Sequence, residues 1–427
     1  MPSTLPTQKR ASPDWTSLPF DISGRVGERL LADDDIDYYM AFRAASHNWR
    51  SATKDYPEKA DYSDPTRFQP SKWALLGQWD DLIVLVNIDT GRSLRKSIPL
   101  LRKYFFIGAT AGGLLLLGEV TEPHRACVLN PFTGSIALFK APVPVVGVRA
   151  VAVTKAPLVV FVSSDNGDIM WADQNSERFK RYWGSGDGNR PTCMTSFAGL
   201  VYATDQQGAV VASTISDVAA GEQSPHSALT VSWDTITPCL DPSVDTSYLA
   251  WLRTGKYYLV ESGGDLLLVT RPPYFASTTR VIVHRIDTER KVLEPVSSIG
   301  SRAIFADPVR CLSIDADKFQ GIKGGCIYFV ESLLVRGINY KPPTMTVFHV
   351  ASPWRDFISF GWCPPEGCFR PIIQVLADYC RSVHYSELFE MEAREWGLDD
   401  PSSSDSESDE SSYSETDDEA LSFEPDE

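Results

Sequence analysis

Four residues near the carboxyl end of the sequence have the side chains and the spacing of a zinc site. They follow the pattern C-x4-C-x11-C-x3-H and comprise Cys363, Cys368, Cys380 and His384. Three thiolates and one imidazole would hold Zn²⁺ in its usual tetrahedral geometry. Free cysteines are, however, often small hydrophobic core residues, and the prolines and apolar residues nearby are typical of the closing segment of a β domain. We favour buried thiols over zinc, and the sequence predicts no cofactor.

The sequence contains no recognisable motif of a bond-breaking enzyme. It lacks the G-x-S-x-G pattern of a serine hydrolase. Its glycine-rich stretches IGATAGGLLLLG and GSGDGNRPT lack the lysine that a phosphate-binding loop needs. The six histidines form no close pair along the chain. We therefore expect a non-catalytic protein, and an enzyme built into a β domain is a weaker alternative.

The last segment is built from serine and acidic side chains. Residues 399–427 contain 13 acidic residues and neither Lys nor Arg. With almost no aliphatic side chains they cannot bury enough surface to offset the entropy lost on folding, so we expect a disordered tail. Six hydroxyl groups stand three positions before an acidic residue, the pattern that casein kinase 2-type kinases accept. These candidate phosphorylation sites are Ser402, Ser404, Ser406, Ser412, Ser414 and Thr416.

The rest of the chain is nearly neutral. The whole sequence has a net charge of −16, but 40 basic and 43 acidic residues precede position 399. A protein that binds nucleic acid by neutralising phosphates needs a basic surface, and the body of the chain does not have that balance. We therefore expect no nucleic-acid partner. The simplest role of the acidic tail is solubility, and binding to a basic partner or groove is the alternative.

No segment has the length expected of a membrane span. The longest uncharged apolar run, from Tyr104 to Gly118, has 15 residues and four glycines, whereas a bilayer core requires roughly 20 residues. The amino end has no apolar stretch typical of a secretory signal. The eight cysteines lack the close, regular pairs of a disulfide framework. We expect a cytoplasmic or nuclear protein that does not enter a membrane.

Residues 14–54 have the apolar spacing of short helices. Ile22, Val26 and Leu30 recur every four residues, which places them on one stripe of a helix that opens at Leu18 and Pro19. Two further short helices follow. Because three short helices cannot enclose a core, we expect a partner to cover this stripe. Packing of the stripe on the rest of the chain is the alternative.

Residues 66–384 change to short runs of β-branched and aromatic residues separated by turn residues, which predicts a series of hairpins. The turns NIDTG, NPFTG and SSDNG place Gly91, Gly134 and Gly167 where tight hairpins need a positive φ. The hairpins recur about every 40 residues, which predicts a β-propeller of about six to eight blades. A pair of β-sandwiches is the alternative.

The helical region resembles an F-box, the module that binds the Skp adaptor of a Skp–Cullin–F-box ubiquitin ligase. The resemblance rests on Trp15, Leu18, Pro19, Asp21, Ile22, Val26, Arg29, Leu30, Asp34, Ile36, Phe42, Arg43, Ala44, Trp49 and Arg50. It implies adaptor contacts by Leu18, Pro19, Ile22, Val26, Leu30, Ile36, Phe42 and Trp49. The sequence departs from the family at Gly24 and Gly27, which replace better helix formers, and at the small Ala45 and Ser46. These departures predict reduced affinity for the adaptor.

The later segments resemble the KIB-type β-propeller, domain of unknown function 295, which follows the F-box in many plant proteins. The similarity lies in LNPFTG, YYLVESGGDLLLV, RIDTERKVLEPVSSIGSRAIF and DKFQGIKGGCIYFVES. We therefore predict a mainly β protein with a small α module at its amino end. The expected order is a disordered segment at 1–12, an F-box at 13–54, a linker at 55–65, a propeller at 66–384, a short helical extension at 385–398 and the disordered acidic tail at 399–427.

The resemblance implies a non-enzymatic substrate receptor. The F-box would bind the Skp adaptor and, through it, Cullin, while the propeller would hold an unidentified target protein. Ubiquitin transfer would then be promoted by proximity rather than by catalytic residues of this chain. The alternative is a propeller-based binding or regulatory protein that has a degenerate F-box and acts outside the ligase.

Overall fold

A computed structural model gives the fold of most of the chain. It describes residues 15, 18–33, 35–53, 64–79, 81–144, 148–164, 167–183, 191–218, 228–237, 257–271, 281–331, 344–352, 355–359 and 371–381. The predicted residues Cys363, Cys368 and His384, the extension at 385–398 and the tail at 399–427, with all six candidate phosphorylation sites, lie outside the described residues.

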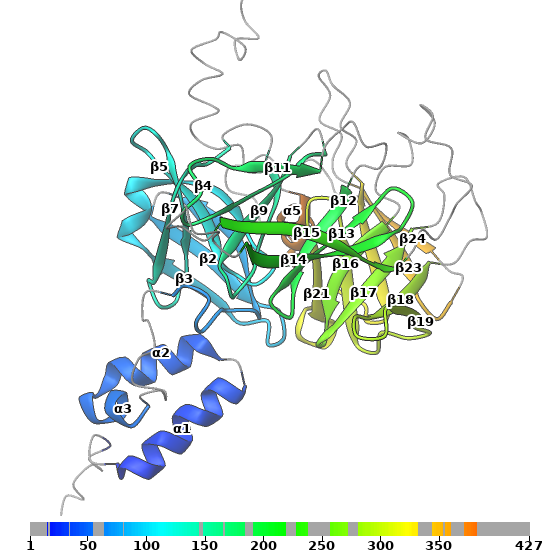
Figure 1. The fold of residues 1–427 in the computed structure, drawn as a ribbon. Coiled ribbons are helices and arrows are strands. Elements are labelled where there is room, and N and C mark those ends of the chain that lie inside the picture. Colours follow the sequence, from blue (N-terminus) through cyan, green and yellow to red (C-terminus); the bar gives the residue numbers. More distant parts are fainter. Residues whose placement is uncertain are drawn as a thin grey trace, which may run out of the picture.

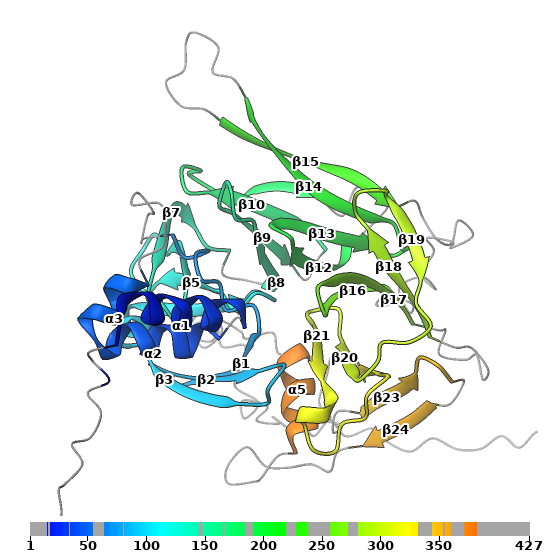
Figure 2. The ribbon, with the colours of Figure 1, turned by 90° about the horizontal axis from the view of Figure 1, so that it is seen from below.

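Within the described residues the strands form six sheets that are arranged around a common centre like the blades of a propeller (Figure 2). Blade 1 comprises β1 (Trp73–Trp79), β2 (Leu82–Asn87) and β3 (Ser93–Ser97). Blade 2 comprises β4 (Tyr104–Ala109), β5 (Leu115–Glu119), β6 (Arg125–Leu129) and β7 (Ile136–Pro142). Blade 3 comprises β8 (Val148–Val153), β9 (Val159–Ser164), β10 (Ile169–Asp173) and β11 (Lys180–Trp183).

The second half of the ring continues this pattern. Blade 4 comprises β12 (Pro191–Phe197), β13 (Leu200–Asp205), β14 (Val210–Val218) and β15 (Ala228–Thr237). Blade 5 comprises β16 (Tyr257–Ser262), β17 (Asp265–Thr270), β18 (Ile282–Asp287) and β19 (Val292–Pro295). Blade 6 has the order β21 (Cys311–Asp315), β20 (Arg302–Ala306), β22 (Cys326–Glu331), β23 (Thr344–His349) and β24 (Arg355–Ser359). The predicted propeller is confirmed, and the sandwich alternative is wrong.

The hydrophobic core is divided among the interfaces between neighbouring blades. Val160 of β9 shares a cluster with Phe105 of blade 2, whereas the next residue, Phe161, shares a cluster with Val201 of blade 4. Consecutive residues of a strand point to opposite faces of its sheet. Each blade can therefore bury two apolar faces, one against each neighbour, and this explains the nearly continuous apolar runs in the sequence.

The hairpin turns have the glycine geometry that the sequence predicts. Gly91, Gly134 and Gly167 have φ values of 71°, 74° and 84°. Gly91 has a second reason to be glycine, because a Cβ there would lie 2.7 Å from the carbonyl oxygen of Lys318 in blade 6. The turn between β2 and β3 thus approaches the last blade closely, and it takes part in closing the ring.

Helix α5 (Ile372–Arg381) packs against the first and last blades. Leu376, Ala377 and Cys380 are fully buried in a cluster that also contains Trp73 of β1 and Tyr328 of β22. This helix was not predicted from the sequence, where the surrounding prolines and apolar residues were interpreted only as the closing segment of the β domain. The spacing of the buried side chains by one and three positions is helical, and their packing between two blades determines the conformation.

Three helices form a module below blade 1 (Figure 1). They are α1 (Phe20–Ala32), α2 (Ile36–Ala45) and α3 (His47–Ala52), which we call the helical module together with Thr53. The three helices predicted for this region are confirmed. In the part of the chain that the structure describes, every helix is too short or too polar to cross a membrane.

Candidate protein-binding surface

Helix α1 packs against α3 through its smallest side chains. Ser23 is 1% exposed, and Gly27 is buried. A Cβ on Gly27 would overlap the Cγ2 methyl group of Thr53, whereas a Cβ on Gly24 would lie 3.5 Å from the carbonyl oxygen of Ala52, an ordinary contact. Gly27 therefore allows a close approach between two helices, which compensates for its low helix propensity of about 1 kcal/mol relative to Ala.

Thr53 joins the three helices at the end of α3. Its hydroxyl donates to the carbonyl oxygen of Trp49 at 2.8 Å. Its own carbonyl oxygen accepts hydrogen bonds from the hydroxyl of Tyr39 at 3.1 Å and from the guanidinium of Arg43 at 2.5 Å. Because Tyr39 and Arg43 belong to α2, these bonds fix α2 against the end of α3. The module is thus held by polar contacts as well as by packing.

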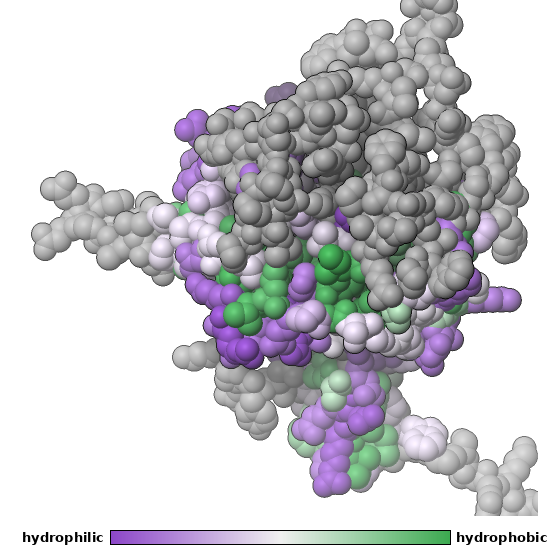
Figure 3. Space-filling model, turned by 90° about the vertical axis from the view of Figure 1, so that its right-hand side faces the viewer, coloured by the Kyte–Doolittle hydropathy of each residue, from purple (hydrophilic) through white to green (hydrophobic). Residues whose placement is uncertain are grey.

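Beside its packed side, α1 carries an apolar stripe of Ile22, Val26 and Leu30, which Leu18 extends from just before the helix. Ile22 is 38% exposed and Val26 is 37% exposed, while Leu18 and Leu30 are half-buried. Phe20, in the first turn, is 66% exposed. In Figure 3 hydrophobic residues lie among hydrophilic ones at the surface of the helical module. Large apolar side chains gathered on one exposed helix are typical of an interaction surface.

Helix α2 faces the other way and docks on the propeller. Ile36 is 2% exposed and belongs to the core cluster of blade 1, against which Met40 also packs. The ring of Tyr39 lies 5.3 Å from that of Phe68, centroid to centroid. Ile36 was predicted to contact an adaptor, and this prediction does not fit the structure, because the propeller already covers its side chain. We therefore leave Ile36 out of the candidate surface.

Arg92, which precedes β3, holds the start of α2. Its guanidinium lies 2.8 Å from a carboxylate oxygen of Asp37 and 3.4 Å from one of Asp35. The same group lies over the rings of Tyr38, at 3.9 Å, and Trp73, at 5.0 Å. Asp35 also caps α2 by accepting a hydrogen bond from the backbone of Tyr38 at 3.2 Å. These contacts orient the helical module, and sequence patterns gave no signal for Arg92.

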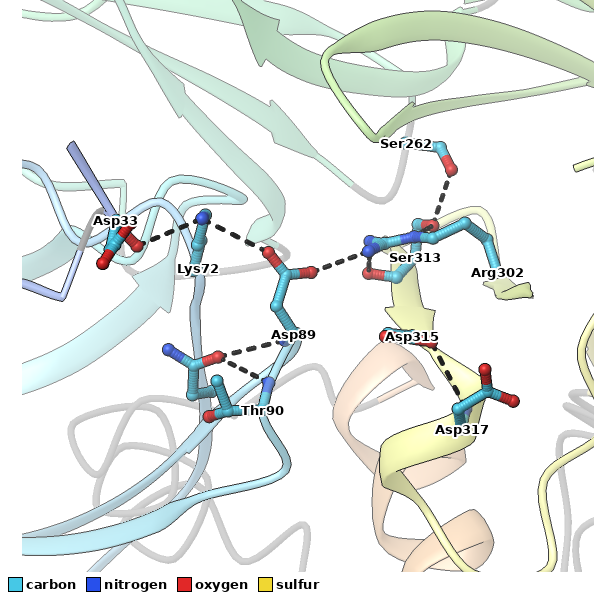
Figure 4. A network of polar contacts seen from close by, with 10 residues as sticks. Asp33, Lys72, Asp89, Thr90, Ser262, Arg302, Ser313, Asp315 and Asp317 are labelled. Atoms are coloured by element: carbon cyan, nitrogen blue, oxygen red, sulfur yellow. Dashed lines mark hydrogen bonds and ion pairs between the residues drawn. The ribbon is translucent and has the colours of Figure 1, made fainter. Parts of the chain in front are cut away.

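A second polar link runs from α1 through blade 1 to blade 6 (Figure 4). The ammonium of Lys72 donates to the carbonyl oxygen of Asp33 at 3.3 Å and lies 3.5 Å from the carboxylate of Asp89. Asp89 in turn accepts a hydrogen bond from Arg302 of β20 at 2.6 Å, and Arg302 donates to the carbonyl oxygen of Ser313 at 2.8 Å. The end of α1 is therefore connected to the contacts that close the ring.

The other predicted adaptor contacts are partly accessible. Phe42 and Trp49 are half-buried and stack with a centroid distance of 4.5 Å and an interplanar angle of 11°. Pro19 is exposed at the start of α1. These residues and the apolar stripe thus remain at least partly accessible, whereas Ile36 and Met40 contact the propeller. This division was predictable only in part, since the stripe is visible in the sequence and the docking side is not.

Cys380 has the surroundings of a core thiol rather than of a metal ligand. Its side chain is fully buried on α5, and its sulfur atom lies 4.0 Å from the carbonyl oxygen of Phe305. Burial raises the pKa of the thiol far above its usual value. The described residues contain no group of three or more side chains that could hold a metal ion. The other three residues of the predicted zinc pattern lie outside the described residues.

A surface hollow of about 410 Å³ lies between blades 2 and 3. It is lined by Glu119, Arg125, Leu138, Phe139, Lys140, Gln174 and Asn175. This lining offers one carboxylate and two basic side chains, and it contains no thiol, hydroxyl or imidazole group. Its mixture of charged, amide and apolar groups is that of ordinary protein surface.

Among the comparisons with known proteins, the family model agrees with the fold. A family model for the KIB1-4 beta-propeller matches residues 85–349. The search of curated proteins found no match. Among solved structures, the crystal structure of the N-terminal domain of Nup159 has 9% sequence identity and a TM-score of 0.25, and the match covers 64% of this chain and 66%, just under two thirds, of that chain. The matched segment begins in blade 1, ends in blade 6 and spans more than half of the sequence. The chain belongs to the KIB1-4 beta-propeller family.

Proposed function

We propose that the chain is the substrate receptor of a Skp–Cullin–F-box ubiquitin ligase, with residues 13–54 as its F-box. A β-propeller is generally a scaffold for protein interactions, and the propeller of this chain supports such a role. The observation that carries the finer proposal is the apolar stripe of α1, in which Ile22 and Val26 stay exposed while Ile36 of α2 is buried against blade 1.

The exposed stripe has the properties of a docking site for another subunit. Ile22 and Val26 are already nearly two-thirds covered by their own module, so their complete burial would contribute roughly 1 kcal/mol each. Phe20 is mostly exposed and offers a larger apolar area. Leu18, Pro19, Leu30, Phe42 and Trp49 complete the proposed adaptor surface.

In this role the chain does no bond chemistry. The adaptor and Cullin hold the helical module, the propeller holds a target protein, and the target is kept near the ubiquitin that is to be transferred. The contacts of Arg92 and Lys72 support such a role, because they fix the orientation of the propeller relative to the adaptor surface. We expect the protein to act in the cytoplasm or the nucleus.

Co-purification with a Skp adaptor tests the proposal. The double variant Leu18→Ala/Ile22→Ala should lose the adaptor and Cullin together, since it removes two side chains of the stripe. The matched control is Ile282→Ala, which truncates a 50% exposed isoleucine of blade 5 and should bind normally. Thermal unfolding of both variants checks that the propeller is intact. Undiminished binding by the folded double variant would contradict the proposal.

A second candidate is a propeller-based binding protein that acts outside the ligase. It is favoured by the small side chains at the junction of α2 and α3, where Ala45 is exposed and Ser46 uses its hydroxyl to accept a hydrogen bond from the backbone of Asn48 at 3.2 Å. These residues offer a partner little apolar area. In this case the unmodified chain itself would bring down no Skp adaptor, while proteins bound by the propeller would still co-purify.

A further inference from the structure

Among the described residues, the outer strand of blade 1 has an open edge. Blade 1 has three strands in the described residues, whereas blades 2 to 6 have four or five, and β3 is its outermost strand (Figure 2). The backbone N–H of Asn87 donates to the carbonyl oxygen of Arg92 at 2.8 Å, so the backbone groups of Arg92 face β2. From Arg92 onward, the backbone groups of successive residues point alternately toward β2 and away from it. Arg95 is three residues further on, so its N–H and C=O point away from β2, as do those of Ser93 and Ser97.

These outward groups have no strand partner among the residues that the structure describes. Their side chains are exposed as well, because Ser93, Arg95 and Ser97 are on the solvent side of β3. An edge of this kind is a template for one more extended segment, and natural proteins usually cover such edges or protect them with charge. In the part of the chain that the structure describes, this edge of blade 1 is therefore open to a fourth strand.

The open edge is also basic. Arg95, Lys96, Arg102 and Lys103 lie within nine residues that contain no acidic side chain. Arg95 and Lys103 are exposed and form no ion pair with a described acidic residue. Arg102 is 71% exposed and lies 2.9 Å from Asp81. Lys96 is turned inward and donates to the carbonyl oxygen of Phe132 at 3.1 Å, so the accessible positive charge belongs to the other three residues.

The sequence contains one segment of complementary charge that is tethered close to this edge. Residues 399–427 have 13 acidic and no basic residues. Helix α5 ends at Arg381 and packs against β1 of the same blade. The 17 residues between Arg381 and Asp399 can span up to about 60 Å, whereas two strand spacings, from β1 to β3, are about 10 Å. The tether is therefore long enough.

We infer that the acidic segment 399–427 binds along the edge of β3 in its own chain. Its carboxylates pair with Arg95, Arg102 and Lys103, and its backbone supplies the missing fourth strand of blade 1. Phosphorylation of its serines adds negative charge and strengthens the contact. The site is next to Arg92, which holds the helical module, but the inference does not depend on a ligase role.

Carbodiimide cross-linking of the full-length protein tests this contact, since the reagent joins a carboxylate to an adjacent lysine amine. We expect cross-links from the tail to Lys103, and far fewer to Lys155, an exposed lysine of blade 3. Salt of about 0.5 M should weaken them, because it screens exposed charges beyond a few ångströms. The variant Arg95→Glu/Arg102→Glu keeps the reporter Lys103 and should lose most of the cross-links.

Two controls make the outcome decisive. Arg178→Glu reverses an exposed charge of blade 3 and should leave the cross-links unchanged, and Arg95→Glu alone serves if the double variant unfolds. Mixing isotopically light and heavy chains distinguishes the chain's own tail from that of a second copy. The inference is overturned if cross-links join light to heavy chains, if Lys155 reacts as often as Lys103, or if folded Arg95→Glu protein cross-links as the unmodified chain does.

Hydrogen exchange tests independently whether the acidic segment forms a strand along β3. Changing every Asp and Glu of 399–427 to Asn or Gln should speed the exchange of the Arg95 amide, which no described strand protects. The amide of Leu94, which pairs with Leu85 of β2, should exchange as before. Equal exchange at Arg95 with and without the tail charges would show that the tail does not cover the edge.

Discussion

The guanidinium of Arg92 lies 2.8 Å from the carboxylate of Asp37, so the residue before β3 holds the first turn of α2. Arg92→Ala removes this pair and the contact with Tyr38. We expect the free energy needed to open the helical module to fall by about 1.5–3 kcal/mol, the usual contribution of hydrogen bonds to charged groups. Hydrogen exchange at the backbone amides of α2 should become correspondingly faster.

The blades should remain folded in this variant, because Arg92 is not part of the link between Asp89 and Arg302. Arg178→Ala, which truncates an exposed arginine of blade 3, serves as the control and should change neither region. If the amides of α2 exchange equally fast in Arg92→Ala and in the unmodified chain, Arg92 does not orient the module.

Gly27→Ala should destabilise the helical module. A Cβ at this position overlaps the Cγ2 methyl of Thr53, whose hydroxyl is fixed by Trp49. Overpacking of this kind costs about 1–3 kcal/mol, which exceeds the gain of about 1 kcal/mol in helix propensity. Limited proteolysis or hydrogen exchange within residues 20–53 would measure the loss of stability of the helical module.

Two variants separate the overlap from other effects of the substitution. Gly24→Ala places its Cβ at an ordinary 3.5 Å from the nearest atom, so it should stabilise α1 by up to about 1 kcal/mol. Thr53→Ser removes the obstructing methyl and keeps the hydroxyl, and it should restore the stability of Gly27→Ala. Failure of this rescue would mean that the close approach of Gly27 and Thr53 does not explain the glycine.

The sequence predicts features that depend on local pattern and misses those that depend on distant contacts. Short β-branched and aromatic runs and turn glycines such as Gly134 predict the propeller, because strand preference and positive φ are local properties. Helix α5 was missed, because Leu376 and Cys380 are buried by blades that lie far away in the sequence. Packing between distant segments overrides the local preference of β-branched residues.

At the candidate surface, too, local pattern predicts some features and distant contacts determine the others. The spacing of Ile22 and Val26 predicts an apolar stripe, and both are exposed. The resemblance to an F-box placed Ile36 on the partner surface, although the propeller buries it. Gly27 was interpreted only as a weak point of the helix, since the position of Thr53 is not visible in a one-dimensional pattern. Which apolar residues stay accessible depends on how the module docks.

Asp89→Asn should weaken the closure of the ring. Asp89 accepts a hydrogen bond from Arg302 at 2.6 Å and lies 3.5 Å from Lys72, so the change leaves two partly buried cations without their anion. Loss of one partner of such a pair costs about 1–3 kcal/mol. We expect a lower urea midpoint for unfolding of the propeller.

A double-mutant cycle with Arg302→Gln tests this link directly. If the two side chains interact, the effects of Asp89→Asn and Arg302→Gln should add up to more than the effect of the double variant. Asp265→Asn is the control, because Asp265 is 53% exposed and lies 3.9 Å from Arg285 in a single blade. Strictly additive effects of Asp89→Asn and Arg302→Gln would count against a shared role in ring closure.

The protein should lose stability in alkaline solution. Cys127 is fully buried on β6, and burial, aided by the nearby charge of Glu119, raises the pKa of its thiol to about 12. Burial also raises the pKa values of other core groups, namely Tyr258, Tyr328, Tyr379 and Cys380. In the unfolded chain a thiol ionises near its ordinary pKa of about 8.5, and a tyrosine near about 10.

The direction in which stability changes with pH follows from which state, folded or unfolded, binds more protons. Above about pH 9 the unfolded chain releases thiol protons that the folded chain keeps up to its raised pKa values. Stability is therefore fully present below this pH and falls as the pH rises, by up to about 1.4 kcal/mol per pH unit for each group. Cys127→Ala should be less stable near neutral pH, because it leaves a cavity, but its urea midpoint should decline less steeply between about pH 9 and 11. Equal slopes for the two proteins would show that Cys127 ionises as readily in the folded chain as in the unfolded one, contrary to its burial between two strands of blade 2.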